Sequence, residues 1–210
     1  MRTPSEKIRD QWLHALLPLV KTRGWTPGAM RAAAREIDLS KGEQALAAPN
    51  GVTDLIDHFF EQSVDLMLET LATEDLDRLR THERVAAGLL AWLDGLAPYK
   101  AAVRKAAGKG FAPWGAGPAA KRVWSISDTI WEAAGDTATD YNRQTKRALL
   151  SAVIPSIVLY WLTHDDRANL ETFIERRLQN AMRLGRSGGK VLGPALDLVE
   201  RVRQKAPPQV

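Results

Sequence analysis

Residues 131–147 read WEAAGDTATDYNRQTKR, and the chain continues as ALLSAVIPSIVLYWL over residues 148–162. The second stretch is apolar on every side of a helix, which is typical of a helix that is buried or faces lipid. It has too few residues to cross a bilayer unaided. Pro155 lies inside it and predicts a kink, because proline removes one helical hydrogen bond. We expect either a central core helix or a helix that lines an apolar cavity.

The stretch before this helix has the pattern of a corner between two helices. Gly135 lies where the end of a helix favours the left-handed conformation, which glycine adopts at little cost. Thr137 precedes Asp140 by three residues, which is the spacing of a capping box, and Asp140 also suits the positive end of the helix dipole. These residue types therefore indicate architecture rather than catalysis. The predicted structural corner comprises Asp128, Gly135, Asp136, Thr137, Asp140, Lys146 and Arg147.

Apolar residues recur at helical spacing along the remaining chain, and we find no convincing strand pattern. Pro27 is well placed to open a helix, whereas Asn50-Gly51 and the glycine- and proline-rich residues 108–118 interrupt the pattern. Besides the helix that begins at Pro27, the predicted helices span residues 5–22, 41–47, 55–71, 74–96, 98–107, 118–134 and 166–184. The sequence therefore predicts an all-α fold.

The composition is that of an ordinary globular protein, with 45% hydrophobic and 26% charged residues. At 210 residues, we expect one domain. No cysteine is present, which excludes disulfides, thiol chemistry and cysteine-ligated zinc. Glu6 and Asp10 interrupt the first 20 residues, so we expect neither a secretory signal nor an organelle transit peptide there. No run reaches the ~20 apolar residues of a membrane-spanning helix, and we expect a cytoplasmic protein.

The tail of the chain carries the whole net charge. Six basic and two acidic residues follow position 182, which accounts for the formal net charge of +4. Its GRSGGK (185–190) matches the G-x-S-x-G pattern, but a charged helix precedes it where a nucleophile elbow needs a strand, so we exclude that chemistry. Residues 191–205, VLGPALDLVERVRQK, predict an amphipathic helix that lies on an anionic membrane surface or docks on the body or a partner. The predicted membrane contacts are Leu192, Leu196, Val199, Arg201, Val202, Arg203 and Lys205.

No pattern of catalytic or metal-binding residues is found. The four histidines stand alone and lack the spacing of zinc ligands. Asp165-Asp166 indicates a helix cap rather than a pair of metal ligands. Gly108 and Gly110 lack the third glycine and the strand-to-helix context of a dinucleotide loop. We therefore expect no enzyme, no metal site and no cofactor.

Two stretches resemble the Coq-nine-type accessory proteins of ubiquinone biosynthesis. The first is GWTPGAMRAAAREIDLS (24–40), followed by NGVTDLIDHFF (50–60). The second and more specific is DTIWEAAGDTATDYN followed by TKRALL (128–150), and ETFIERRL (171–178) is a weaker match. The positions that match the family pattern are Asp128, Trp131, Gly135, Asp136, Thr139, Asp140, Asn142, Thr145, Lys146 and Arg147. The resemblance covers about residues 20–184.

The resemblance implies a helical fold similar to tetracycline-repressor-type regulators and a lipid-binding role beside a quinone-modifying enzyme, without catalysis. We expect residues 1–184 to form one lipid-binding domain. Its residues 1–72 would be a degenerate helix-turn-helix part and 73–184 the part that forms the pocket. Residues 185–210 would be a linker and the basic amphipathic helix. One departure concerns the partner: Arg143-Gln144 stands where the family has an aromatic pair that meets its hydroxylase.

The resemblance favours the cavity interpretation of residues 148–162, with an isoprenoid quinone precursor or a phospholipid as the ligand. Lys146 and Arg147 cannot enter such a cavity unpaired, and we expect them to pair with Asp128 or Asp136. The predicted lipid-binding residues are Leu89, Trp92, Leu93, Trp124, Ile130, Trp131, Leu150, Ile154, Pro155, Val158 and Trp161.

The expected partners are this lipid, a ring-modifying enzyme such as a hydroxylase, a membrane surface and a second copy of the chain, but no nucleic acid. The expected location is the cytoplasmic side of a bacterial inner membrane, as a peripheral protein. Two alternatives stay open. The first is a tetracycline-repressor-type transcription regulator, although residues 40–50 carry one lysine and one glutamate, which suits DNA poorly. The second is a scaffold that binds no lipid.

Overall fold

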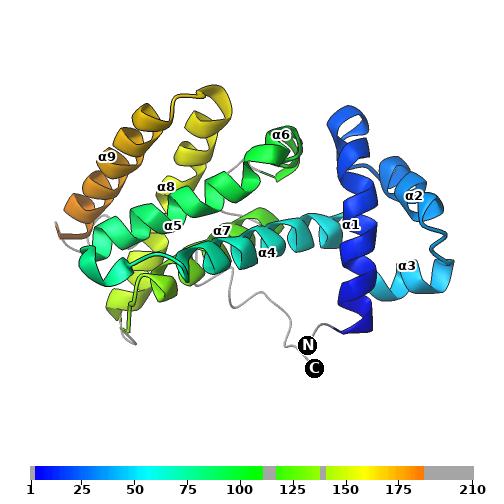
Figure 1. The fold of residues 1–210 in the computed structure, drawn as a ribbon, viewed down its shortest axis with the longest axis horizontal. Helices are drawn as coiled ribbons and strands as arrows, with labels where there is room; N and C mark the ends of the chain where they lie inside the picture. Colours follow the sequence, from blue (N-terminus) through cyan, green and yellow to red (C-terminus); the bar gives the residue numbers. More distant parts are fainter. Residues whose placement is uncertain (1–2, 111–116, 138–140, 187–210) are drawn as a thin grey trace. The chain divides into compact units, whose positions relative to one another are not determined.

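The computed structural model describes residues 3–110, 117–137 and 141–186. Within these ranges the chain is helical and contains no strand, so the predicted all-α class is confirmed (Figure 1). The α-helices are α1 (Pro4–Arg23), α2 (Pro27–Glu36), α3 (Lys41–Ala47), α4 (Val52–Leu71), α5 (Thr81–Leu96), α6 (Lys100–Gly110), α7 (Pro118–Ala133), α8 (Tyr141–Thr163) and α9 (Arg167–Arg186). Two short 3-10 helices are η1 (Leu76–Arg78) and η2 (Ala97–Tyr99).

Two predicted helices differ from the observed ones. The helix predicted over 74–96 begins only at Thr81, because η1 and the extended Leu79 interrupt the chain before it. The apolar helix predicted over 148–162 is the C-terminal part of α8, which begins at Tyr141 and continues through Pro155. The helix count is otherwise as the apolar spacing predicts within the described residues.

The length of α8 corrects the expectation that it is too short to cross a membrane. Residues 143–163 are the one stretch of the described chain that is long and apolar enough to do so, judged by length and composition. A core helix meets the same criteria, and 56% of the stretch is buried in this structure. The polar first turns of α8, which hold Arg143, Lys146 and Arg147, were not counted in the predicted apolar run. The finding is therefore weak evidence for a membrane span.

The chain divides into two compact units. Unit 1 comprises residues 1–65 and 96–112, and unit 2 comprises residues 66–95 and 113–210. Residues 96–112 belong to unit 1, where α6 contacts α1. The expected single domain, with parts 1–72 and 73–184, stays a prediction. Helical periodicity describes the faces of a single helix, so it does not reveal which earlier helix a later one meets.

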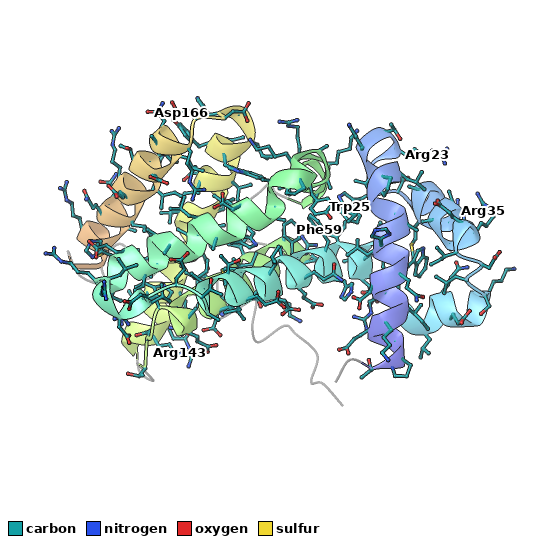
Figure 2. All side chains as sticks on the ribbon, viewed as in Figure 1. Arg23, Trp25, Arg35, Phe59, Arg143 and Asp166 are labelled. Atoms are coloured by element: carbon teal, nitrogen blue, oxygen red, sulfur yellow. The ribbon has the colours of Figure 1, made fainter. Side chains whose placement is uncertain are left out.

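Unit 1 gives a physical role to each residue of the Gly-Trp-Thr segment. Gly24 ends α1 with a φ of 67°, a conformation that favours glycine. Trp25 is fully buried, and its indole N–H donates to the carbonyl oxygen of Ala102 at 2.9 Å. Thr26 caps α2 by accepting from the backbone N–H of Ala29. Trp25 also packs on Phe59, with 5.6 Å between ring centroids (Figure 2). In this segment Gly24 therefore ends one helix, Trp25 fixes the turn in the core, and Thr26 caps the next helix.

Unit 2 is built around α8. This helix packs against α7 on one side and α9 on another. Its buried apolar side chains recur at helical spacing and include Leu150, Ile154, Ile157, Val158 and Trp161. Helix α5 approaches α7 closely at Gly88, where an added Cβ atom would lie 3.2 Å from the Cγ2 atom of Ile130. The core of this unit is therefore formed by α8 with α7 and α9, and α5 meets α7 at Gly88.

Candidate functional site

The corner between α7 and α8 begins at Gly135, as predicted. Gly135 has a φ of 82°, and its backbone N–H donates to the carbonyl oxygen of Glu132 at 3.0 Å. The next N–H, that of Asp136, donates to the carbonyl oxygen of Trp131 at 3.0 Å. These bonds satisfy the last carbonyl groups of α7 and turn the chain toward α8. A residue with a Cβ atom would strain this turn, which explains the glycine.

A buried arginine is held between two carboxylates at this corner. The side chain of Arg147 is 1% exposed, and its Nε atom donates to Asp128 while Nη1 lies 2.8 Å from Oδ2 of Asp136. Nζ of Lys146 lies 2.7 Å from the other oxygen of Asp136, which is itself 4% exposed. Burial lowers the pKa of Arg147, but hydrogen bonds to Asp128 and Asp136 outweigh this effect and raise it. The expected pairing of both cations is therefore present.

Arg143 joins the same network from the outside. Its Nη2 atom lies 3.0 Å from Oδ1 of Asp128 and 2.9 Å from Oε1 of Glu132, and its side chain is one third exposed (Figure 2). It thus bridges α7 and the first turn of α8. This position departs from the family pattern, and its ion pairs were not among the predicted contacts. The available signal was the spacing of four residues between Arg143 and Arg147, which puts both on one face of a helix.

Two further side chains tie α7 to α8 through the backbone. The indole N–H of Trp131 donates to the carbonyl oxygen of Lys146 at 3.1 Å, and Nζ of Lys146 lies 5.3 Å from the centroid of that indole ring. The hydroxyl of Ser127, which is fully buried, donates to the carbonyl oxygen of Arg147 at 2.9 Å. Ser127 was not among the predicted site residues, because a lone serine in a helix gives no sequence signal.

The predicted lipid-binding residues all lie in unit 2. They come from α5, α7 and α8. Those from α5 are Leu89, Trp92 and Leu93, those from α7 are Trp124, Ile130 and Trp131, and those from α8 are Leu150, Ile154, Pro155, Val158 and Trp161. Trp124, Trp131 and Pro155 are partly exposed and the others are buried. Their role toward lipid stays a prediction.

Two hollows among the described residues lie along α1 in unit 1. Their volumes are about 810 Å³ and about 260 Å³, and His14, Leu17, Pro18 and Tyr99 border both. Neither is lined by a residue that we predicted to bind lipid. No group of three or more His, Asp or Glu side chains in the described ranges is placed to hold a metal ion.

Some predicted residues lie outside the described residues. Asp140 is one of them, so its capping box with Thr137 stays a prediction; α8 begins at Tyr141. The predicted membrane contacts of the tail are the others, namely Leu192, Leu196, Val199, Arg201, Val202, Arg203 and Lys205. Asp166, in contrast, is described and caps α9 by accepting from the backbone N–H of Asn169 at 3.1 Å, as expected.

Residues 116–185 match the COQ9 protein family, which includes the whole corner. The chain is 26% identical to the ubiquinone biosynthesis protein COQ9 of Bos taurus and to that of Homo sapiens over 93% of its length, and it spans 64% of each. It is 29% identical to COQ9-A of Xenopus laevis over 87% of its length, and it spans 60% of that protein. The predicted resemblance is therefore confirmed.

The fold is similar to that of a solved TetR transcriptional regulator from Nitrosomonas europaea. The TM-score is 0.63 at 19% sequence identity, and the match covers 84% of this chain and 98% of that one. The predicted tetracycline-repressor-like fold is therefore confirmed. At this level of identity the similarity concerns the fold alone.

The predicted location is contradicted by the same comparisons. We expected a cytoplasmic protein peripheral to a bacterial inner membrane, but the COQ9 relatives are named as mitochondrial proteins. A helical fold and a chain without cysteine are compatible with either compartment, so neither observation could decide between them.

Proposed function

We propose that this chain, which resembles COQ9 over nearly its whole length, acts in ubiquinone biosynthesis as a lipid-binding accessory protein. It would hold an isoprenoid quinone precursor and present it to a ring-modifying enzyme, such as a hydroxylase, at a membrane surface. The observation that carries the proposal is the similarity over 93% of the chain to proteins named for ubiquinone biosynthesis. The separate match to the COQ9 family, over residues 116–185, includes the corner between α7 and α8.

The core of unit 2 supports the lipid part of this proposal. Helices α5, α7 and α8 each contribute buried apolar side chains to this unit, and the buried side chains of α8 are almost all apolar beyond its first turns. Burying an isoprenoid tail stabilises a complex by about 0.8 kcal/mol per methylene group. A few isoprene units are therefore enough to hold a lipid without polar contacts.

The charges of the corner support a role without catalysis. Asp128, Glu132 and Asp136 each accept from a basic side chain of α8. Carboxylates arranged in this way hold two helices together, and we propose that none of them acts as a general acid or base. We also propose that the protein forms a homodimer, and Leu159 of α8, which is 61% exposed, is the residue whose substitution tests it.

The lipid content of the purified protein tests the proposal. We expect isoprenoid lipid to copurify with the wild type and to fall in Ile154→Trp, because Ile154 is buried among the predicted lipid-binding residues. Such overpacking costs about 1–3 kcal/mol, so circular dichroism must show that the variant is still folded. Leu68→Trp is the matched control, since Leu68 is 40% exposed. Mass spectrometry that finds no isoprenoid lipid in the wild type would refute the proposal.

The alternative function, a transcription regulator, is favoured by the fold alone. Helix α3 (KGEQALA) is the third helix of the chain, which is the place of the recognition helix in such a regulator. Its one basic residue is Lys41, and the negative charge of Glu43 offsets the charge of Lys41. Phosphate contacts supply most of the affinity of a DNA-binding protein. The charge of α3 therefore favours the lipid-binding proposal.

A further inference from the structure

Two buried polar atoms on α8 have no hydrogen-bond partner among the described residues. They are Nη2 of Arg147 and the hydroxyl oxygen of Ser151. Every other nitrogen of the Arg147 guanidinium group is bonded, to Asp128, Asp136 and the carbonyl oxygen of Arg143. An unpaired buried polar atom is costly, so such atoms indicate a missing partner.

The two atoms belong to neighbouring side chains. Ser151 follows Arg147 by four residues, which puts both side chains on the same face of the helix, with about 5–6 Å between their Cβ atoms in a regular helix. A guanidinium nitrogen donates, and a hydroxyl both donates and accepts. An oxygen atom is therefore the partner that satisfies both.

The charges around this pair exclude an anionic partner. Three cations, Arg143, Lys146 and Arg147, already face three carboxylates, those of Asp128, Glu132 and Asp136. A phosphate would add buried negative charge to a group that is already balanced. A neutral carbonyl or hydroxyl oxygen adds none.

The same face of α8 turns apolar beyond Ser151. Ile154 and Val158 follow Arg147 by seven and eleven residues, and both are buried. In the opposite direction, Arg143 lies one turn before Arg147 and is partly exposed. This face of α8 is therefore partly exposed at its start, polar at Arg147 and Ser151, and apolar beyond them. A lipid with a neutral polar head group and an apolar tail has the same order of polar and apolar parts.

We propose that Nη2 of Arg147 and the hydroxyl of Ser151 bind a neutral ring oxygen of the lipid, a carbonyl or a phenolic hydroxyl. The tail would then lie along Ile154 and Val158. The inference rests on the proposed function and adds to it the class of head group and its orientation. A quinone or phenol fits this position, whereas the phosphate group of a phospholipid or of a prenyl diphosphate does not.

Three probes with similar tails test this assignment on the full chain. They are decylubiquinone, which carries neutral ring oxygens, decylbenzene, which has none, and dodecyl phosphate, which is anionic. Each is titrated into the protein, and the bound probe is separated by gel filtration and quantified. Ser151→Ala removes the hydroxyl with little change in volume. Ser156→Ala is the matched control, because the Ser156 hydroxyl on the same helix already donates to the carbonyl oxygen of Val153 at 2.8 Å.

We expect Ser151→Ala to weaken decylubiquinone binding by roughly 2- to 10-fold, which corresponds to the loss of one hydrogen bond. Its affinity for decylbenzene should not change, and Ser156→Ala should change neither. Unchanged decylubiquinone affinity in Ser151→Ala, or tighter binding of dodecyl phosphate than of decylubiquinone to the wild type, overturns the head-group site alone. If the wild type binds neither decylubiquinone nor decylbenzene, the proposed function fails as well.

Discussion

Arg147 is the most buried charged side chain that the structure describes. Its position depends on Asp136, which is nearly as buried and also pairs with Lys146. An arginine that loses one of its carboxylates inside a protein keeps its charge, because its pKa stays far above neutral. Loss of a buried carboxylate should therefore lower the stability of the corner more than loss of an exposed one.

We predict that Asp136→Ala lowers the free energy of unfolding by about 3–5 kcal/mol, the range for removing one partner of a buried ion pair. Glu132→Ala is the control, since its carboxylate is more than half exposed and pairs with the partly exposed Arg143. Its effect should be under about 1 kcal/mol. Urea unfolding monitored by circular dichroism measures both. An equal decrease in the free energy of unfolding in the two variants would show that Asp136 stabilises the corner no more than Glu132 does.

His58 is a second buried ionisable residue, in unit 1. Its Nε2 atom lies 2.7 Å from Oδ1 of Asp10, and its Nδ1 atom lies 3.5 Å from Oε2 of Glu61. Burial lowers the pKa of His58, but hydrogen bonds to Glu61 and Asp10 outweigh it, so the pKa is raised from its ordinary value of 6.5. The folded state therefore binds this proton more tightly than the unfolded state does.

A raised pKa stabilises the fold when the histidine is protonated. The contribution of His58 should be fully present below about pH 6.5 and be lost as the pH rises through the folded-state pKa. We therefore predict that the stability difference between the wild type and His58→Gln shrinks between pH 6 and pH 8. The free energy of unfolding at each pH gives this difference, and His82→Gln serves as the reference variant. A difference that grows with pH would contradict the assignment.

At the scale of elements, the charge of α3 bears on the proposal that this chain does not bind DNA. A single lysine cannot neutralise the phosphates that a recognition helix normally contacts. We predict no specific binding to duplex DNA at physiological salt, measured by fluorescence anisotropy with genomic fragments. Sequence-selective binding at nanomolar concentration would favour the regulator instead.

The segment after α9 is the second element with a distinct prediction. Residues 187–210 carry a stripe of apolar residues together with four basic and two acidic residues, which is half of the formal net charge of +4. An apolar stripe with basic residues beside it is a combination that binds anionic membrane surfaces. We predict that deletion of residues 187–210 weakens binding to liposomes that contain phosphatidylserine and leaves the helical signal of the rest unchanged. Cosedimentation measures the binding. Equal binding by both proteins would mean that the tail docks on the protein or a partner.

At the scale of the whole molecule, the proposed dimer is testable through Leu159. Light scattering should give a mass near twice the 23.2 kDa of one chain. Leu159→Glu should shift it to one chain, because a charge in an apolar contact is costly. Leu46→Glu is the control, since Leu46 is equally exposed but lies on α3 in unit 1. A wild type of one-chain mass would contradict the proposal.

Local sequence determined where the helices lie, except for the starts of α5 and α8. Apolar spacing located the helices of the described residues, and short-range signals such as Pro27, Gly135 and Asp166 marked helix ends. These signals act between residues within one or two turns of each other, so the chain carries them before it folds. The helix predicted over residues 74–80 is wrong, because no short-range residue pattern there indicates the 3-10 helix.

Tertiary structure alone decided which helices meet and what the charged residues do. The sequence predicted that Arg147 pairs with Asp128 or Asp136, but not that Arg143 closes the same network or that Ser127 and Trp131 hold the backbone of α8. The sequence also did not predict that α6 contacts α1 or that the hydroxyl of Ser151 is buried without a partner among the described residues. These contacts join residues that are far apart in the chain or depend on burial. Neither is defined until the helices have packed against each other.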